Sequence, residues 1–179
     1  MKGRELLIGV TGGIAAYKTA ALVSQLVQAG AGVTVLMTRA AQQLVGAKTF
    51  EALSGRPVYT RVFGRGAHPH IEVAQQADLL CVAPATANIM AKAACGLADD
   101  LLSTVLLSFT GPVLMAPAMN TLMWQKPAVQ RNVAQLRADG ITLIDPEEGH
   151  LSCGMTGPGR MAEPDTIFRA IAERLKQRD

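Results

Sequence analysis

The 179-residue sequence has few aromatic residues, which make up 4% of it, and few charged residues, at 17%. Small aliphatic side chains must therefore supply most of the apolar surface, and hydrophobic residues reach 49%. The net charge of +3 and the lack of any basic run argue against a nucleic-acid partner but leave an anionic small molecule possible. So high an apolar content indicates buried contact between subunits, or an efficient alanine-rich core.

Three cysteines cannot all pair within one chain. Cys81 lies in an apolar run and Cys95 in a helical pattern, so we expect both to be buried small hydrophobes of a reduced, cytoplasmic protein. No segment approaches the roughly 18 apolar residues of a membrane helix, and no metal site is expected. Lys2 and Arg4 precede an apolar stretch, as in a signal peptide, but Glu5 and the glycine pair that follows contradict that interpretation.

Apolar runs alternate with helical patterns along the chain, which predicts parallel βαβ units with strands buried on both faces. Strands are expected at residues 5–11, 32–37, 79–83, 112–116 and 141–144, with a weaker candidate at 58–62. Helices are expected at residues 15–28, 71–77, 86–109, 127–139 and 164–176. The sequence therefore predicts a single α/β domain over residues 1–179, built on a doubly wound parallel sheet.

Residues 145–164, DPEEGHLSCGMTGPGRMAEP, interrupt this alternation. They are rich in glycine and proline and have no clean period. A structureless stretch of that length in a compact domain is usually a functional loop or lid, so we name residues 145–164 the flap.

The first expected strand leads into GVTGGIAAYK, which places Gly12 and Gly13 between a strand and a helix. Ligands of open α/β sheets bind beyond the carboxyl ends of the strands, and two glycines there let backbone N–H groups approach an anion at a helix start. Thr38, after the second strand, offers a hydroxyl at the same edge. The motif is neither G-x-G-x-x-G nor a P-loop, and many such turns use glycine only for its permissive backbone.

Four further motifs are more specific. They are HIE at 70–72, APATAN at 83–88, PAMNTLMW at 117–124 and SCGMTGPGRM at 152–161. Together with GVTGGIAAYK, and in this order, they resemble the flavin-containing cysteine decarboxylases over essentially the whole chain. Within that family the resemblance is strongest to the enzymes that act on phosphopantothenoylcysteine (PPC) in coenzyme A biosynthesis.

This resemblance implies a flavodoxin-like fold that holds FMN between the subunits of a trimer, often assembled into a dodecamer. In bacteria the domain is often fused to the ligase that makes the substrate, so the chain is expected to be either a stand-alone enzyme or an excised domain. The flavin contacts that the resemblance implies are Gly12, Gly13, Ile14, Thr38, Thr86, Ala87, Asn88, Ile89 and Ala118. The first three would hold the phosphate with help from Thr38, and Ala118 would lie near the isoalloxazine ring.

At the substrate, His70 matches the catalytic histidine of the family, Asn120 the residue that contacts the substrate carboxylate, and Cys153 the cysteine of the flap. Met123 and Gly154 are also expected to contact the substrate. Direct loss of CO2 from an N-acylated cysteine would leave an unstabilised carbanion, so a cofactor must carry the difficult step. The resemblance implies that the substrate CH2–SH group is oxidised to a thioaldehyde, that its C=S group accepts the electrons released with CO2, and that Cys153 protonates the final carbon. The overall reaction is redox-neutral and gives 4′-phosphopantetheine.

Two departures from the family pattern concern substrate recognition. Met155 stands where an acidic residue is common, two positions after Cys153, and Gln75 stands where a basic residue is common, five positions after His70. Arg160 could meet the substrate phosphate or face solvent. His68 and His150 are expected to be solvent or loop residues.

Two alternative functions remain open: a peptidyl-cysteine decarboxylase that matures lantibiotic peptides, and a non-enzymatic FMN-binding regulatory subunit. The first would use His70 and Asn120 but would need no reductive Cys153. The second would be favoured by the absence of His70 or Cys153, and both are present. A flavin prenyltransferase of the same fold would lack the histidine and the P-x-M-N motif.

Overall fold

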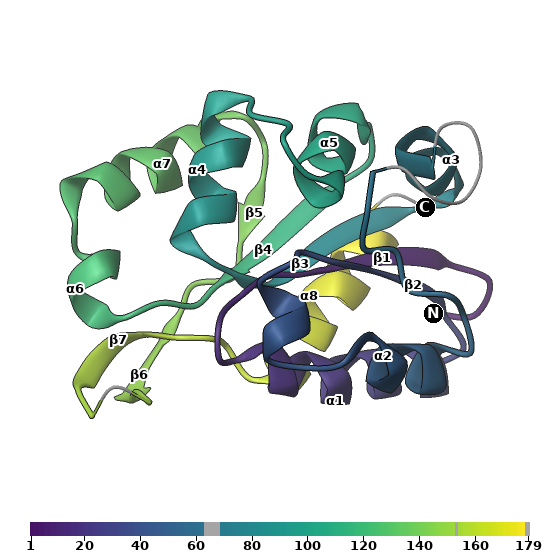
Figure 1. The fold of residues 1–179 in the computed structure, drawn as a ribbon, viewed down its shortest axis with the longest axis horizontal. Helices are drawn as coiled ribbons and strands as arrows, with labels where there is room; N and C mark the ends of the chain where they lie inside the picture. The colour runs from purple at the N-terminus through teal and green to yellow at the C-terminus, as the bar shows by residue number, and fades with distance from the viewer. Residues whose placement is uncertain (63–68, 153, 178–179) are drawn as a thin grey trace.

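Five parallel strands form the centre of the molecule, in the order β2-β1-β3-β4-β5 (Figure 1). The computed structural model describes residues 1–62, 69–152 and 154–177, with the side chains of Pro69 and His70 excepted. The strands are β1 (Glu5–Val10), β2 (Gly32–Met37), β3 (Leu79–Ala85), β4 (Val113–Pro117) and β5 (Thr142–Leu143). This order is that of flavodoxin-like sheets, and it confirms the predicted doubly wound α/β fold.

Helices cover both faces of this sheet (Figure 1). On one face lie α1 (Ala16–Gln28), α2 (Ala47–Ser54) and α8 (Pro164–Lys176). On the other lie α3 (Pro69–Gln76), α4 (Ala87–Cys95), α5 (Leu101–Ser108) and α7 (Pro127–Ala138). Because both faces of the sheet are covered, its strands are buried on both sides and read as continuous apolar runs.

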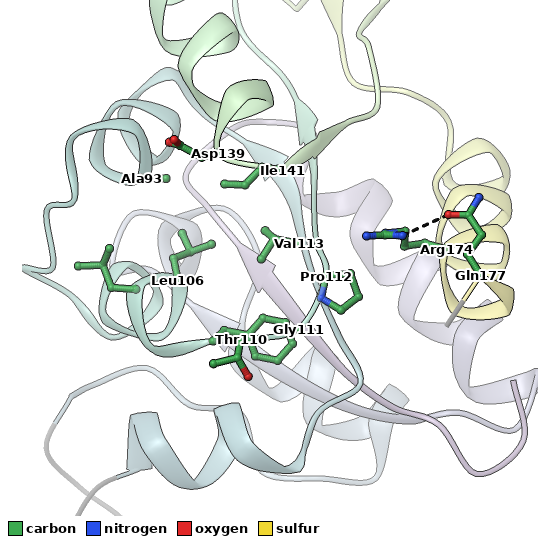
Figure 2. Close-up of a pocket in the computed structure, with 13 residues that line it drawn as sticks. Ala93, Leu106, Thr110, Gly111, Pro112, Val113, Asp139, Ile141, Arg174 and Gln177 are labelled. Atoms are coloured by element: carbon green, nitrogen blue, oxygen red, sulfur yellow. Dashed lines mark hydrogen bonds between the residues drawn. The ribbon is translucent and has the colours of Figure 1, made fainter. Parts of the chain in front are cut away.

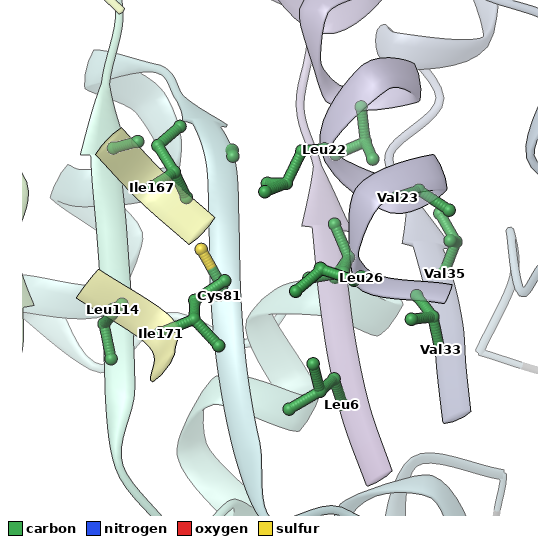
Figure 3. Packing of buried hydrophobic residues seen from close by; sticks show 14 of the residues in the cluster. Leu6, Leu22, Val23, Leu26, Val33, Val35, Cys81, Leu114, Ile167 and Ile171 are labelled. Atoms are coloured by element: carbon green, nitrogen blue, oxygen red, sulfur yellow. The ribbon is translucent and has the colours of Figure 1, made fainter. Parts of the chain in front are cut away.

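Alternate residues of the strands belong to two separate clusters of buried side chains, one on each face of the sheet. Leu6 and Ile8 of β1 pack toward α1 and α8, whereas Leu7 between them joins the cluster on the opposite face. Figure 3 shows the first cluster, in which Cys81 lies beside Ile167 and Ile171 of α8. Complete burial raises the pKa of the Cys81 thiol to about 12, so this group stays protonated and serves as an apolar core residue.

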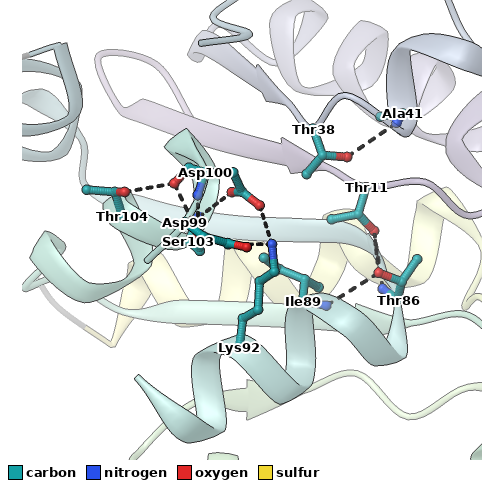
Figure 4. Close-up of polar contacts among 10 residues, drawn as sticks. All are labelled: Thr11, Thr38, Ala41, Thr86, Ile89, Lys92, Asp99, Asp100, Ser103 and Thr104. Carbon is teal, nitrogen blue, oxygen red and sulfur yellow. Dashed lines mark hydrogen bonds and ion pairs between the residues drawn. The ribbon is translucent and has the colours of Figure 1, made fainter. Parts of the chain in front are cut away.

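The expectation that Cys95 is also buried is wrong, because its side chain is exposed at the end of α4. The helix expected at 86–109 is in fact two helices, since Gly96 takes the left-handed conformation at φ 67° and ends α4. Asp100 then caps α5 by accepting the N–H of Ser103, while the Ser103 hydroxyl accepts the N–H of Asp100. This turn also brings Lys92 within 2.6 Å of Asp100 (Figure 4).

Three short helical elements were not predicted: α2, the 3-10 helix η1 (Ala41–Gln43) and α6 (Thr121–Trp124). The weak strand expected at 58–62 reduces to a single bridge between Tyr59 and Leu36. The flap was predicted to lack regular structure, and that prediction is wrong. It contains an antiparallel hairpin of β6 (Glu147–His150) and β7 (Thr156–Arg160), whose glycine-rich strands show no alternation of apolar and polar residues.

None of the helices in the described ranges has the length and apolar character needed to cross a membrane.

Candidate functional site

The turn between β1 and α1 leaves backbone donors available for an anion. The N–H groups of Gly12, Ile14 and Ala15 donate to no acceptor among the described residues. They precede a 13-residue helix with no acidic residue in its first turn, so the positive end of the helix dipole is not neutralised there. Donors of this kind at a helix start fit a phosphate group.

Close packing explains why glycine occupies both central positions of this turn. A Cβ atom placed on Gly12 would lie 2.4 Å from the Cβ atom of Ala40, in the loop that follows β2. A Cβ atom on Gly13 would lie 3.3 Å from the ring of Pro84. The pair therefore lets the turn, the loop after β2 and the end of β3 meet at the carboxyl edge of the sheet.

Thr11 and Thr86 hold the ends of β1 and β3 together beneath this turn (Figure 4). The buried Thr11 hydroxyl donates to the carbonyl oxygen of Pro84 at 2.7 Å and accepts the N–H of Thr86 at 3.2 Å. Thr86 in turn caps α4 by accepting the N–H of Ile89. The hydrogen bonds fix the start of α4 beside the start of α1.

A cavity of about 560 Å³ opens at this edge, between the glycine turn and the flap. Eight of the predicted contact residues line it: Gly12, Gly13, Ile14, Thr86, Ala87, Ala118, Asn120 and Met123. Its wall away from the glycines is largely apolar, with Ala118, Met119, Met123 and Met161. A donor-rich end and an apolar wall fit the phosphate and the ring system of a flavin mononucleotide.

Four predicted contacts are not in that lining. Thr38 lies after β2, where its hydroxyl accepts the N–H of Ala41 at 3.2 Å. Ile89 is buried in the core, whereas Asn88 is exposed on the first turn of α4. Gly154 lies in the turn of the flap and donates its N–H to Leu151. Their roles at the cofactor or substrate stay predictions.

Asn120 presents an oriented amide to the cavity. It caps α6 through Oδ1, which accepts the N–H of Leu122 at 2.8 Å. Because only an oxygen can accept this N–H, the bond tells the two ends of the amide apart. The nitrogen Nδ2 is the donor at the other end. Nδ2 lies 3.3 Å from the sulfur of Met155 in the flap. A stronger acceptor, such as a carboxylate, could take the place of this sulfur.

The flap is seated on the segment that carries Asn120. The N–H of Met119 donates to the carbonyl oxygen of Gly159 at 3.0 Å. A Cβ atom on Gly159 would lie 2.3 Å from the carbonyl oxygen of Met119, and one on Gly157 would lie 2.9 Å from the hydroxyl of Thr121. The two glycines of β7 thus allow this strand to pack closely on the backbone of Met119 and the side chain of Thr121.

Charged residues at the rim of the cavity are held together by one carboxylate. Glu163 accepts from Lys18 at 2.8 Å and also pairs with Arg160 of β7. The hydrogen bond from Lys18 keeps the pKa of the Glu163 carboxyl below its usual value. The side chain of Arg160, left open by the sequence, therefore contributes to the rim and is engaged by an acid.

His150, Tyr17 and Lys18 also line the cavity and were not predicted as site residues. His150 was expected to be a solvent or loop residue, and although it is exposed, it faces the same hollow as Asn120. Its position depends on the β6–β7 hairpin, so no sequence pattern indicated it. Tyr17 and Lys18 are the continuation of the Gly-Gly motif into the first turn of α1.

Of the two other predicted catalytic residues, the structure describes only the backbone of His70. Cys153 lies outside the described residues. The backbone of His70 belongs to α3, which is at the upper right of Figure 1, whereas α6, β6 and β7 lie at the lower left. Within one chain, the structure does not bring the helix of His70 to the cavity that Asn120 lines.

A second cavity, of about 580 Å³, lies at the opposite edge of the sheet (Figure 2). It opens where β4 begins, at Val113, and is also lined by Ile141, Asp139 and Arg174. Its lining includes none of the predicted site residues that the structure describes. Ligands of such sheets bind at the carboxyl edge, so we assign the candidate site to the cavity beside Gly12.

Comparison with known proteins shows the family of the chain. The model of the family described as Flavoprotein matches residues 1–176. The chain is 50% identical over 178 residues to the Coenzyme A biosynthesis bifunctional protein CoaBC of Bacillus subtilis (strain 168), an alignment that covers 97% of this chain and 43% of that protein. The protein of the same name from Mycolicibacterium smegmatis is 48% identical over 177 residues, with 98% and 42% covered. The chain thus spans less than half the length of these relatives.

Two solved structures are similar over their whole length. The FMN-dependent cysteine decarboxylase SpaF is 36% identical, with a TM-score of 0.86 and coverage of 98% of this chain and 97% of that one. A mutant PPC decarboxylase in complex with pantothenoylaminoethenethiol is 32% identical, with a TM-score of 0.86 and 100% of both chains covered.

Proposed function

Because this chain belongs to the Flavoprotein family, we propose that it binds FMN and decarboxylates PPC to 4′-phosphopantetheine, a step of coenzyme A biosynthesis. The likeness to CoaBC proteins and to a PPC decarboxylase structure supports the substrate, and the likeness to FMN-dependent enzymes supports the cofactor. The observation that carries the proposal is the oriented amide of Asn120 in the wall of a cavity whose other end offers free N–H donors.

The residues of the glycine turn would hold the FMN phosphate. The N–H groups of Gly12, Ile14 and Ala15 supply the hydrogen bonds, and the α1 dipole favours the negative charge. Ala118 and Met119 would line the ring of the flavin. When bound, FMN would supply the two-electron chemistry at the substrate thiol that no side chain can supply.

Asn120 would bind the carboxylate that leaves as CO2. Its Oδ1 is committed to the backbone of Leu122, so its Nδ2 can donate to a carboxylate oxygen without rotating the amide. An amide donor positions the carboxylate without adding a full positive charge, which would stabilise the substrate more than the neutral product. The flap would cover the reacting atoms and exclude water.

We also propose that the active site forms between two copies of the chain, in a trimer or in a dodecamer built from trimers. The distance between α3 and the Asn120 cavity within one chain supports this arrangement, because His70 could then reach the cavity of a neighbouring copy. Exposed apolar side chains at the cavity, among them Ile14, Tyr17 and Met123, are suited to burial by that neighbour. His70 would serve as base or as carboxylate orienter, a role suited to a pKa of about 6.5.

The substitution Cys153→Ser tests the reaction and separates it from peptidyl-cysteine decarboxylation. A serine hydroxyl is a far weaker acid than a thiol, whose reference pKa is about 8.5, so protonation of the last carbon should fail. We expect one turnover that releases CO2, bleaches the flavin and leaves a product two hydrogens lighter than 4′-phosphopantetheine. Fully reduced product at the wild-type rate would show that Cys153 is not the proton donor. The unreduced product, two hydrogens lighter, from the wild type itself would favour the peptide-modifying alternative.

Mixing two inactive variants tests the shared site. We expect His70→Asn and Asn120→Ala each to lower turnover by roughly 10²- to 10⁴-fold while FMN stays bound. When the two are unfolded together and refolded, about a quarter of the sites should combine the intact His70 of one copy with the intact Asn120 of another. Return of activity to that level supports the shared site, and a mixture as inactive as its parts would refute it.

A further inference from the structure

A second group of cations lies at the carboxyl edge of the sheet, beyond the end of β2. A hollow of about 440 Å³ there is lined by Arg39, Gln42, Gln43, Thr60 and Arg61. Each of these side chains carries a hydrogen-bond donor, and none of them is a carboxylate. Building on the proposed function, we propose that this hollow, the Arg39–Arg61 site, binds the phosphate monoester end of the substrate while Asn120 holds its carboxylate end.

The charge of the two arginines is available to a ligand. Neither Arg39 nor Arg61 forms an ion pair with a described residue. The cations at the rim of the main cavity differ, because Lys18 and Arg160 share the carboxylate of Glu163. An unpaired arginine fork binds phosphate oxygens through parallel N–H···O bonds, so the Arg39–Arg61 site is the better match for a dianion.

The backbone ties this site to the glycine turn. Ala40, the neighbour of Arg39, packs against Gly12 so closely that a Cβ atom there would lie 2.4 Å away. Thr60 and Arg61 follow Tyr59, whose carbonyl oxygen accepts the N–H of Met37 at 2.9 Å at the end of β2. Both arginines therefore leave the same edge of the sheet as the residues of the main cavity.

The substrate is long enough to reach from the end of β2 to the end of β4. Three interstrand spacings lie between β2 and β4, after which Asn120 follows, and these amount to about 14 Å. About twelve covalent bonds separate the carboxylate carbon of PPC from its phosphorus, and an extended chain of that length spans about 13–14 Å. One substrate molecule could therefore contact both ends.

The test compares PPC with pantothenoylcysteine, which lacks the phosphate, on four proteins. These are the wild type, Arg39→Gln, the double variant Arg39→Gln/Arg61→Gln, and the control Arg131→Gln. Arg131 is an exposed arginine of α7 that, like Arg39 and Arg61, forms no ion pair with a described residue. We expect the double variant to raise the KM for PPC by about tenfold or more, since charge-assisted hydrogen bonds are lost, with kcat and the flavin spectrum unchanged. The KM for pantothenoylcysteine should be the same in all four.

An equal rise in KM for both substrates, or no rise for PPC, would overturn the phosphate assignment. Titration of the FMN-loaded proteins with inorganic phosphate, followed by ³¹P line broadening, gives a readout that does not depend on activity. Binding that is lost in the double variant and kept in Arg131→Gln supports the site, and binding kept in both overturns it. If the wild type decarboxylates neither substrate, the proposed function fails, and the phosphate titration still decides the site.

Discussion

The side-chain amide of Asn120 donates from Nδ2 to the sulfur of Met155, across 3.3 Å. A thioether is a weak acceptor. In the proposed complex the substrate carboxylate would displace this sulfur from Nδ2 and accept its hydrogen bond.

Replacing Met155 should weaken substrate binding when the new side chain accepts a stronger hydrogen bond from Asn120. Met155→Gln offers Asn120 a stronger acceptor, so the substrate must break a better hydrogen bond and the KM for PPC should rise by about two- to tenfold. Met155→Leu keeps the apolar volume without an acceptor and is the matched control, with a KM no higher than that of the wild type. Steady-state kinetics give both values, and an unchanged KM in Met155→Gln would contradict displacement of the sulfur.

The contact between β7 of the flap and Met119 should not tolerate an added methyl group. Gly159→Ala places a Cβ atom 2.3 Å from the carbonyl oxygen of Met119, in a residue at φ 130°, so β7 must lift from the cavity wall. We expect roughly 1–3 kcal/mol of destabilisation and a large loss of turnover with FMN retained. Gly46→Ala, where a Cβ atom would meet nothing within 4 Å, is the control. Equal activity in the two variants would show that the flap does not depend on this contact.

Thr121 carries a buried hydroxyl without a hydrogen-bond partner among the described residues. Thr121→Val removes the unsatisfied group at nearly constant volume and should stabilise the protein by about 1 kcal/mol. Thr19→Val is the matched contrast, because the buried Thr19 hydroxyl donates to the carbonyl oxygen of Ala83 at 2.7 Å, and its loss should destabilise the protein. Urea unfolding of both variants measures these changes. Destabilisation by Thr121→Val would mean that its hydroxyl has a partner in solution.

The start of α5 should confer a stability that depends on pH. Burial raises the pKa of Asp100, but hydrogen bonds from Lys92 and Ser103 outweigh it and hold that pKa below its usual value. The stabilisation is therefore present above about pH 4 and is lost as the pH falls through the lower, folded-state pKa. Asp100→Asn keeps the capping oxygen but loses the charge, so it should be less stable than the wild type by a few tenths to about 1 kcal/mol at pH 7.

This deficit should shrink between pH 7 and pH 3, because the stabilisation by the charge falls once the unfolded-state carboxyl protonates below about pH 4. Thermal unfolding at the two pH values measures the difference between the proteins. Asp139→Asn, at the exposed end of α7, should show no such convergence. A deficit of the same size at both pH values would rule out the charge of Asp100 as its cause.

The sheet was predictable because its residues carry local signals. The apolar run of β2 and the proline that begins α8 each gave boundaries that agree with the structure, at 32–37 and 164–176. Gly96 could have signalled the end of α4, since glycine is the usual residue at a left-handed helix end. The apolar pattern on both sides of it concealed the break.

The rest of the site depends on contacts between distant segments. The fit of Gly12 against Ala40, and of Gly157 against Thr121, exists only once the loops have met. The same holds for His150, which reaches the cavity through a hairpin that has no alternating pattern. Sequence motifs therefore indicated Asn120 and the glycine turn, but not His150 of the flap.

Incubation of the purified, flavin-loaded protein with PPC tests the account most directly. The flavin released by denaturation should have the mass of FMN, and each PPC consumed should give one CO2 and one 4′-phosphopantetheine, with the flavin oxidised at the end. CO2 is measured by capture, and the thiol product is measured by mass spectrometry. A protein that holds FMN and binds PPC but releases no CO2 would contradict the proposed function.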